Sequence, residues 1–83
     1  RPRQLQVITA RDCDLCNGLL ARLGPYVDSG QVTLELLPLD EHPGLRAAHL
    51  FRVPVVLEGP AELMWGRIEA AELSTVLGEV GAS

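Results

Sequence analysis

Apolar residues recur along the chain at two spacings, one typical of strands and one typical of helices. A run of β-favouring residues at 4–10 predicts a buried strand. The next segment has leucines at four-residue spacing, which predicts a helix with one side facing a core. The members of this stripe are Leu15, Leu19, Leu20, Leu23 and Val27.

This first helix contains Gly24-Pro25, and we expect it to kink or end there. Proline lacks the backbone N–H of a helical residue, and its ring clashes with the preceding turn. We therefore predict an irregular last turn through Tyr26 and Val27, with Ser29-Gly30 as the stop.

The second half of the pattern predicts further strands and helices. Alternation at 31–37 predicts a strand, and a loop at 38–44 follows it. Pro43 suits the first position of a short helix over 45–50. The remaining predicted elements are a strand at 53–57, its antiparallel hairpin partner at 62–66, and a helix at 69–77 that Gly78 ends.

The predicted order is β-α-β-α-β-β-α, which indicates an α/β fold with a four-stranded mixed sheet flanked by helices. The first two strands and the helix between them form a βαβ unit, so these strands should be parallel with a right-handed crossover. At 83 residues the chain is long enough for one core, and we expect a single domain over 1–83.

Composition and charge argue against several classes of protein. The net charge of −4 does not suit a nucleic-acid partner, and we expect none. No apolar run approaches the roughly 18 residues of a membrane helix, and no signal segment begins the chain, so we expect a cytoplasmic protein without a membrane partner. We also expect a monomer. All seven basic residues are arginines, which suggests a GC-rich, bacterial source.

The chemistry that the sequence offers lies in Cys13 and Cys16, the only cysteines. They follow the first strand and open the first helix, for which Asp12 is the predicted N-cap. The positive end of the helix dipole favours a thiolate at Cys13, which makes this residue the expected nucleophile. Cys16 lies on the same helical face and can close a disulfide with it, so the pair can hold or release two electrons.

The cysteine pair has two other interpretations. A structural zinc site needs four ligands, and only His42 and His49 are available to complete it. Six residues separate these histidines, which is wider than the usual spacing, so we predict no metal site and expect His49 to be a surface or helix-end residue. Two inert buried cysteines are the second alternative. The strand before and the helix after the motif favour a redox pair.

The element order, the Cys-x-x-Cys after the first strand and Val53-Pro54 at the start of the third strand resemble the thioredoxin fold. The compact length and the segment Leu50-Phe51-Arg52-Val53-Pro54-Val55 are most similar to small glutaredoxin-like proteins of bacteria. The resemblance implies that Cys13 attacks and Cys16 resolves. It also implies that Pro54 is a cis-proline facing the sulfurs, and that the backbone of Val53 pairs with an extended substrate.

Some residues depart from the pattern of that family. The two residues inside the motif are Asp14-Leu15, which differ from those of thioredoxins and glutaredoxins. The fourth strand is followed by Gly66-Arg67-Ile68-Glu69, which lacks the double glycine of the glutathione-binding pattern in glutaredoxins. We therefore expect weak glutathione binding. Asp12 and Asp14 oppose the helix dipole at Cys13, whereas Arg11 and Arg52 favour a thiolate.

The leading hypothesis is a thiol-disulfide oxidoreductase that acts on a protein or small-molecule disulfide without a cofactor. Its site residues would be Cys13 and Cys16, with Arg52, Val53 and Pro54 binding substrate. The alternative is a thioredoxin-fold interaction module or redox sensor that binds a protein partner through the Val53-Pro54 edge or a surface containing Trp65.

Overall fold

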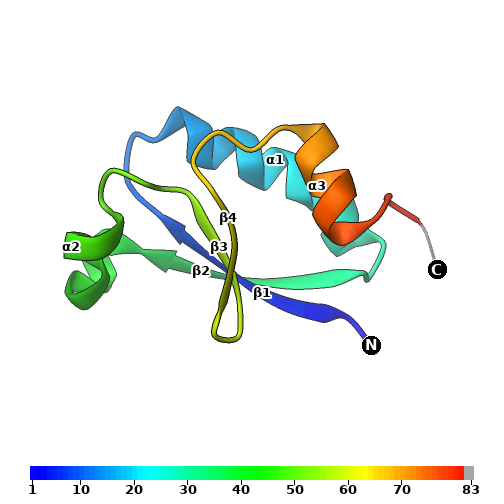
Figure 1. The fold of residues 1–83 in the computed structure, drawn as a ribbon, viewed down its shortest axis with the longest axis horizontal. Coiled ribbons are helices and arrows are strands. Elements are labelled where there is room, and N and C mark those ends of the chain that lie inside the picture. The colour runs from blue at the N-terminus through cyan, green and yellow to red at the C-terminus, as the bar shows by residue number, and fades with distance from the viewer. Residues whose placement is uncertain (82–83) are drawn as a thin grey trace.

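The computed structural model describes residues 1–81 and has a four-stranded sheet at its centre (Figure 1). The strands are β1 (Arg3–Thr9), β2 (Val32–Pro38), β3 (Val55–Glu58) and β4 (Ala61–Trp65). Their spatial order is β2-β1-β3-β4, with β1 parallel to β2 and β3 antiparallel to both of its neighbours. The parallel pair and the antiparallel hairpin are those that the sequence predicts.

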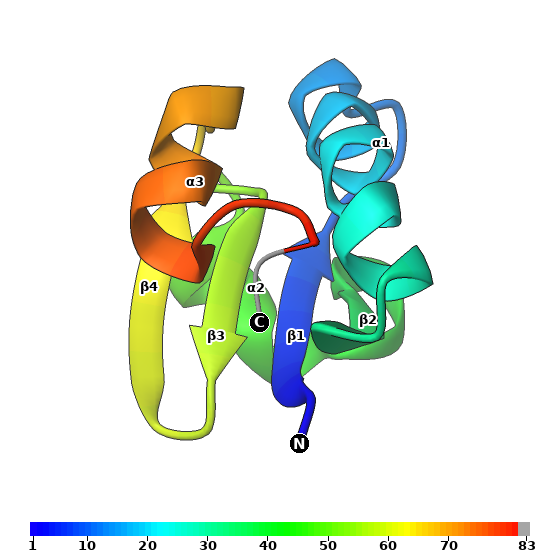
Figure 2. The same ribbon diagram turned by 90° about the vertical axis from the view of Figure 1, so that its right-hand side faces the viewer.

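Three α-helices accompany the sheet within the described residues: α1 (Asp14–Asp28), α2 (Pro43–His49) and α3 (Ala70–Leu77). Helices α1 and α3 cover one face of the sheet, whereas α2 lies at the end where β1 and β2 finish (Figures 1 and 2). A short 3₁₀ helix, η1 (Leu39–Glu41), precedes α2 in a segment predicted as a loop. Apart from η1, the order of elements is the predicted one.

Buried side chains form a cluster on each face of the sheet, because alternate residues of β1 point to opposite sides. Leu5 and Val7 face α1 and α3, while Ile8 faces η1 and α2. Burying one such side chain stabilises the fold by about 1.5 to 3 kcal/mol. The larger cluster contains Leu5, Val7, Leu19, Leu23, Tyr26, Val32, Val56, Met64, Ile68, Leu73 and Leu77.

The end of α1 differs from the prediction, because the helix continues through Pro25 to Asp28. The proline lies in the last turn, where it removes the one hydrogen bond that would reach the carbonyl of Ala21. Ala21 is exposed, so solvent can hydrate this carbonyl. The side of α1 that faces the core also changes in this region. Tyr26 is buried, whereas Val27, predicted to face the core, is 39% exposed.

Helix α3 begins and ends close to the predicted residues. Glu69 is its N-cap, and Gly78 stops it with a φ of 81°, a backbone conformation that favours glycine. Ile68 before the cap and Leu73 in the next turn are both buried in the larger cluster. This arrangement is a hydrophobic staple at the start of α3.

Arg3 connects β1 to β3 and α3. Its Nε and Nη2 donate to the two carboxylate oxygens of Glu58 over 2.9 and 2.8 Å, and its Nη1 donates to the carbonyl oxygen of Val76 over 3.0 Å. The hydrogen bonds raise the pKa of Arg3 and lower the pKa of Glu58. This contact ties together parts of the chain that are far apart in sequence.

Candidate active site

The connection from β1 to α1 brings Cys13 to the start of the helix. Asp12 has a φ of 52°, in the left-handed region, and α1 begins at Asp14. The N-cap is therefore Cys13, with φ −112° and ψ 101°, and the prediction that Asp12 is the N-cap is wrong. An N-cap residue needs an extended backbone, which Asp12 lacks because the chain turns sharply at that residue.

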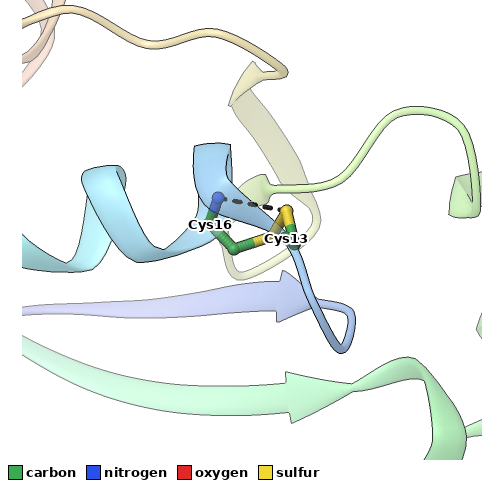
Figure 3. The surroundings of a disulfide bond; sticks show 2 residues. All are labelled: Cys13 and Cys16. Carbon is green, nitrogen blue, oxygen red and sulfur yellow. Dashed lines mark hydrogen bonds between the residues drawn. A yellow bond between two sulfur atoms is a disulfide. The ribbon is translucent and has the colours of Figure 1, made fainter.

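Cys13 and Cys16 form a disulfide across the first turn of α1 (Figure 3). Their Cα atoms lie 5.2 Å apart. Cys13 is partly exposed, whereas Cys16 is 2% exposed and packs against the protein interior. Of the two sulfurs, that of Cys13 is the one that solvent and a partner can reach.

Hydrogen bonding and the helix dipole both act on the Cys13 sulfur. It accepts a hydrogen bond from the backbone N–H of Cys16 over 3.1 Å (Figure 3). As the N-cap, it also lies at the positive end of a helix of 15 residues. Both features favour a thiolate over a thiol at this sulfur when the disulfide is reduced.

Charged side chains near the motif act in the opposite sense. Asp12 and Asp14 flank Cys13 and are exposed. Arg11, predicted to favour a thiolate, forms an ion pair with Asp40 of η1, with 3.2 Å between Nε and the carboxylate oxygen. Its positive charge is therefore partly balanced by a carboxylate outside the motif.

The peptide bond between Val53 and Pro54 is cis, as the resemblance implies. Pro54 is buried, and its carbonyl oxygen accepts a hydrogen bond from the N–H of Gly66 over 2.8 Å. The next residue, Val55, pairs with Ile8 at the end of β1, from which the chain runs to the cysteines. The segment from α2 to β3 accordingly passes beside the disulfide (Figure 3).

Arg52 lies in a cluster that sequence patterns did not identify. Its guanidinium forms an ion pair and hydrogen bond with Glu62 of β4, and its Cζ lies 4.7 Å from the ring centroid of Trp65. The hydrogen bond from Arg52 and the charges of Arg52 and His49 lower the pKa of Glu62. Arg52 is ten or more residues from both partners, and the only sequence signal for the cluster is the predicted hairpin, which places Glu62 and Trp65 in one strand.

Two large apolar side chains, one in this cluster and one next to it in the chain, are unusually exposed for their size. Phe51, in the turn after α2, is 95% exposed, and Trp65 is 53% exposed. Val53, between Arg52 and Pro54, is partly exposed. The predicted site residues Arg52, Val53 and Pro54 therefore all belong to the segment between α2 and β3, and Arg52 directs its charge at Glu62.

The histidines considered as zinc ligands lie elsewhere. His42 precedes α2 and His49 ends it. Nδ1 of His49 is buried and has no hydrogen-bond partner among residues 1–81. Over the same residues, no group of three or more His, Cys, Asp and Glu side chains is arranged to hold a metal ion.

Comparison with solved structures places the fold in a known class. Protein Ne2328 from Nitrosomonas europaea is 25% identical over 93% of both chains, with a TM-score of 0.73. Protein XcR50 from X. campestris is 22% identical over 86% of this chain and 91% of its own, with a TM-score of 0.70. Thioredoxin 1 from Thermosipho africanus is 19% identical over 88% of each chain, with a TM-score of 0.63. The fold is thioredoxin-like.

This thioredoxin-like fold is what the sequence predicts from the positions of Cys13, Cys16 and Pro54. No family model matches the chain, and no curated protein matches it either. A disulfide between Cys13 and Cys16 in this fold is compatible with a redox function. Among residues 1–81, no helix is long and apolar enough to cross a membrane.

Proposed function

We propose that this chain is a thiol-disulfide oxidoreductase that works through Cys13 and Cys16. The observation that carries the proposal is the asymmetry of the pair at the start of α1. Cys13 is accessible and accepts a backbone hydrogen bond, whereas Cys16 is buried within disulfide reach of it. This arrangement gives one sulfur to attack a substrate and a second to release the product.

In the reductive direction, the thiolate of Cys13 attacks one sulfur of a substrate disulfide. An S–S bond forms between Cys13 and that sulfur, and the other substrate sulfur leaves as a thiolate. Cys16 loses its proton and attacks Cys13, which forms the Cys13–Cys16 disulfide and expels the second substrate thiolate. Two electrons pass from the protein to the substrate, and the two product thiolates take up protons.

The segment beside the disulfide supplies the proposed substrate contacts. Val53 is partly exposed and lies next to the buried Pro54, so its backbone can pair with an extended segment of substrate. Arg52 supports this segment by pairing with Glu62 and stacking on Trp65. The proposal thus keeps Val53 as a contact residue and gives the buried Pro54, together with Arg52, a role in holding the substrate-binding segment in place.

The proposal includes a glutaredoxin-like subtype, a bacterial source and a cytoplasmic, monomeric protein in which 1–83 form one domain. The length of 83 residues supports one domain, and the all-arginine set of basic residues supports a bacterial source. The partner would be a protein disulfide substrate, or a reductant that restores the dithiol.

Turnover tests the proposal. Catalytic amounts of the protein are mixed with dithiothreitol and a disulfide-containing protein such as insulin, and reduction is followed over time. We expect a rate proportional to the amount of protein, lost in the Cys13→Ser variant. A wild-type rate equal to that of dithiothreitol alone would overturn the proposal. The equilibrium potential of the pair in glutathione and thioredoxin buffers would then give the direction of electron flow.

A second candidate is a binding module or redox sensor without turnover. The observation that favours it is the exposure of Phe51 (95%) and Trp65 (53%), since large exposed aromatic side chains are typical of binding surfaces. The same turnover assay separates the two functions. A binding module would form its disulfide once and would not cycle with the external reductant.

A further inference from the structure

Two surfaces of different character lie at the end of the sheet from which the chain runs to Cys13. The first, which we call the aromatic flank, consists of Phe51, Val53 and Trp65. Phe51 is 95% exposed and Trp65 53% exposed, and Arg52, which follows Phe51 in the chain, stacks on the Trp65 ring. Leaving such side chains in water forgoes the stabilisation that burial would bring, so exposed apolar groups of this size indicate a contact surface.

The aromatic flank lies within reach of the sulfurs. Phe51 is three residues before Pro54, so their Cα atoms are at most about 10 Å apart. Pro54 precedes Val55, which pairs with Ile8 at the end of β1, and the chain from α2 to β3 passes beside the disulfide (Figure 3). A segment bound at Cys13 can therefore place a side chain against Phe51.

The second surface, which we call the acidic flank, lies on the side of the β1–α1 connection and η1. It consists of Asp12, Asp14, Asp40 and Glu41, all of which are exposed. Arg11 balances one of these four carboxylates through its ion pair with Asp40. Arg52, beside the aromatic flank, has its charge balanced by Glu62. The side chains of the acidic flank therefore carry a net negative charge beside the accessible cysteine.

We infer that the partner of this site is a protein disulfide whose cysteine lies between basic residues and next to an apolar side chain. The inference rests on the proposed function and adds the class of substrate to it. The apolar side chain would pack on the aromatic flank, and the basic residues would face the acidic flank. Complementary charge raises the rate of encounter, and like charge lowers it, so acidic disulfides are disfavoured at the same surface.

The test uses three peptide disulfides that differ only beside the cysteine, where each carries arginine, serine or glutamate, with a leucine two residues away. Single-turnover reduction by the pre-reduced protein is followed by stopped flow. Flanking charge also changes the intrinsic reactivity of each peptide, so every rate is divided by the rate with dithiothreitol. We expect the normalised rate to be about tenfold higher for the arginine peptide than for the glutamate peptide at low salt.

Salt and variants then locate the origin of the preference. In 1 M salt, where the screening length is about 3 Å, the preference should nearly disappear. The double variant Asp12→Asn with Asp14→Asn should reduce the preference at least about threefold. Asparagine tolerates the left-handed backbone of Asp12, which makes this a conservative change.

A matched control is available on the same helix. Asp28 is exposed at the other end of α1, about 20 Å from Asp14. The Asp28→Asn variant should retain the full preference. Phe51→Ser should slow all three leucine-containing peptides by a similar factor and leave the charge preference in place.

The outcomes separate this inference from the proposed function. If none of the peptides is reduced faster than with an equal concentration of the Cys13→Ser variant, the proposed function fails. If all are reduced at equal normalised rates, or if the glutamate peptide is favoured, the oxidoreductase stands and the substrate class is overturned. A preference that survives in the double variant would also overturn it.

Discussion

The sulfur of Cys13 accepts a hydrogen bond from the backbone N–H of Cys16, over a distance of 3.1 Å. One residue thus serves both as the N-cap of α1 and as the accessible half of the disulfide. The burial of Cys16 supports the proposed roles, in which Cys13 attacks and Cys16 resolves. This relationship leads directly to a test of the two roles.

Replacing Cys16 with serine should trap partners on Cys13 as stable mixed disulfides, because no second sulfur remains to release them. Replacing Cys13 with serine should trap few, because the remaining sulfur is 2% exposed. Non-reducing gels and mass spectrometry of a protein-disulfide mixture measure the trapped fraction. Equal trapping by the two variants would contradict this assignment.

Glutathione disulfide should be a poor substrate. The residues Gly66-Arg67-Ile68-Glu69 lack the double glycine of glutaredoxins, and each half of glutathione carries two carboxylates towards a negative surface. We expect its rate, relative to that with dithiothreitol, to be at least about fivefold below that of neutral 2-hydroxyethyl disulfide. A fast, saturable rate would contradict this, and the Arg67→Gln variant would then show whether Arg67 supplies a carboxylate contact.

Removing the hydroxyl of Tyr26 should destabilise the fold. Tyr26 is buried and its hydroxyl donates to the carbonyl oxygen of Gly78 over 2.8 Å, which joins the end of α1 to the end of α3. The Tyr26→Phe variant should lose about 1 kcal/mol in the free energy of unfolding, measured by denaturant titration. As a control, Thr75→Ala removes an exposed hydroxyl bonded to its own helix and should change stability by less than about 0.5 kcal/mol.

The Arg3–Glu58 pair should make stability depend on pH. The hydrogen bond from Arg3 lowers the pKa of Glu58 in the folded state below its ordinary value of 4.5. The pair therefore contributes fully above that value, and its contribution is lost as the pH falls through the lower pKa of the folded state. We expect wild type to be more stable than Glu58→Gln at pH 7, and we expect this difference to shrink as the pH falls below 4.5 and through the lower pKa of the folded state.

Denaturant midpoints at several pH values measure this effect. The exposed residue Glu79 provides the control, and Glu79→Gln should follow the wild-type curve. A difference between wild type and Glu58→Gln that stays constant down to pH 3 would show that the ion pair is not its source.

The local features of the fold could be predicted because they depend on neighbouring residues. Strand alternation, the stop at Gly78 and the position of Pro43 each follow from a few adjacent side chains. The thioredoxin-like fold could be predicted from the order of these elements along the chain and from the positions of Cys13 and Pro54 within that order.

Features that depend on tertiary contacts could not be predicted in the same way. The left-handed backbone of Asp12 moves the N-cap to Cys13, although aspartate is among the residue types preferred at N-caps. Helix α1 continues through Pro25 because Tyr26 is held in the core. The partner of Arg52 is Glu62 on an edge strand, and no short-range pattern links these two residues.

Strand β1 lies between β2 and β3, so the strand that leads into the cysteine motif is hydrogen-bonded on both sides. Central strands usually open only with the whole fold, whereas surface loops open locally and often. The amide hydrogens of Val7 and Ile8 should therefore exchange with deuterium far more slowly than those of Arg11 and Asp12, a few residues along the chain. Cys13 directly follows this loop, so in the proposed redox cycle the loop would adjust around the sulfur while the sheet stays closed.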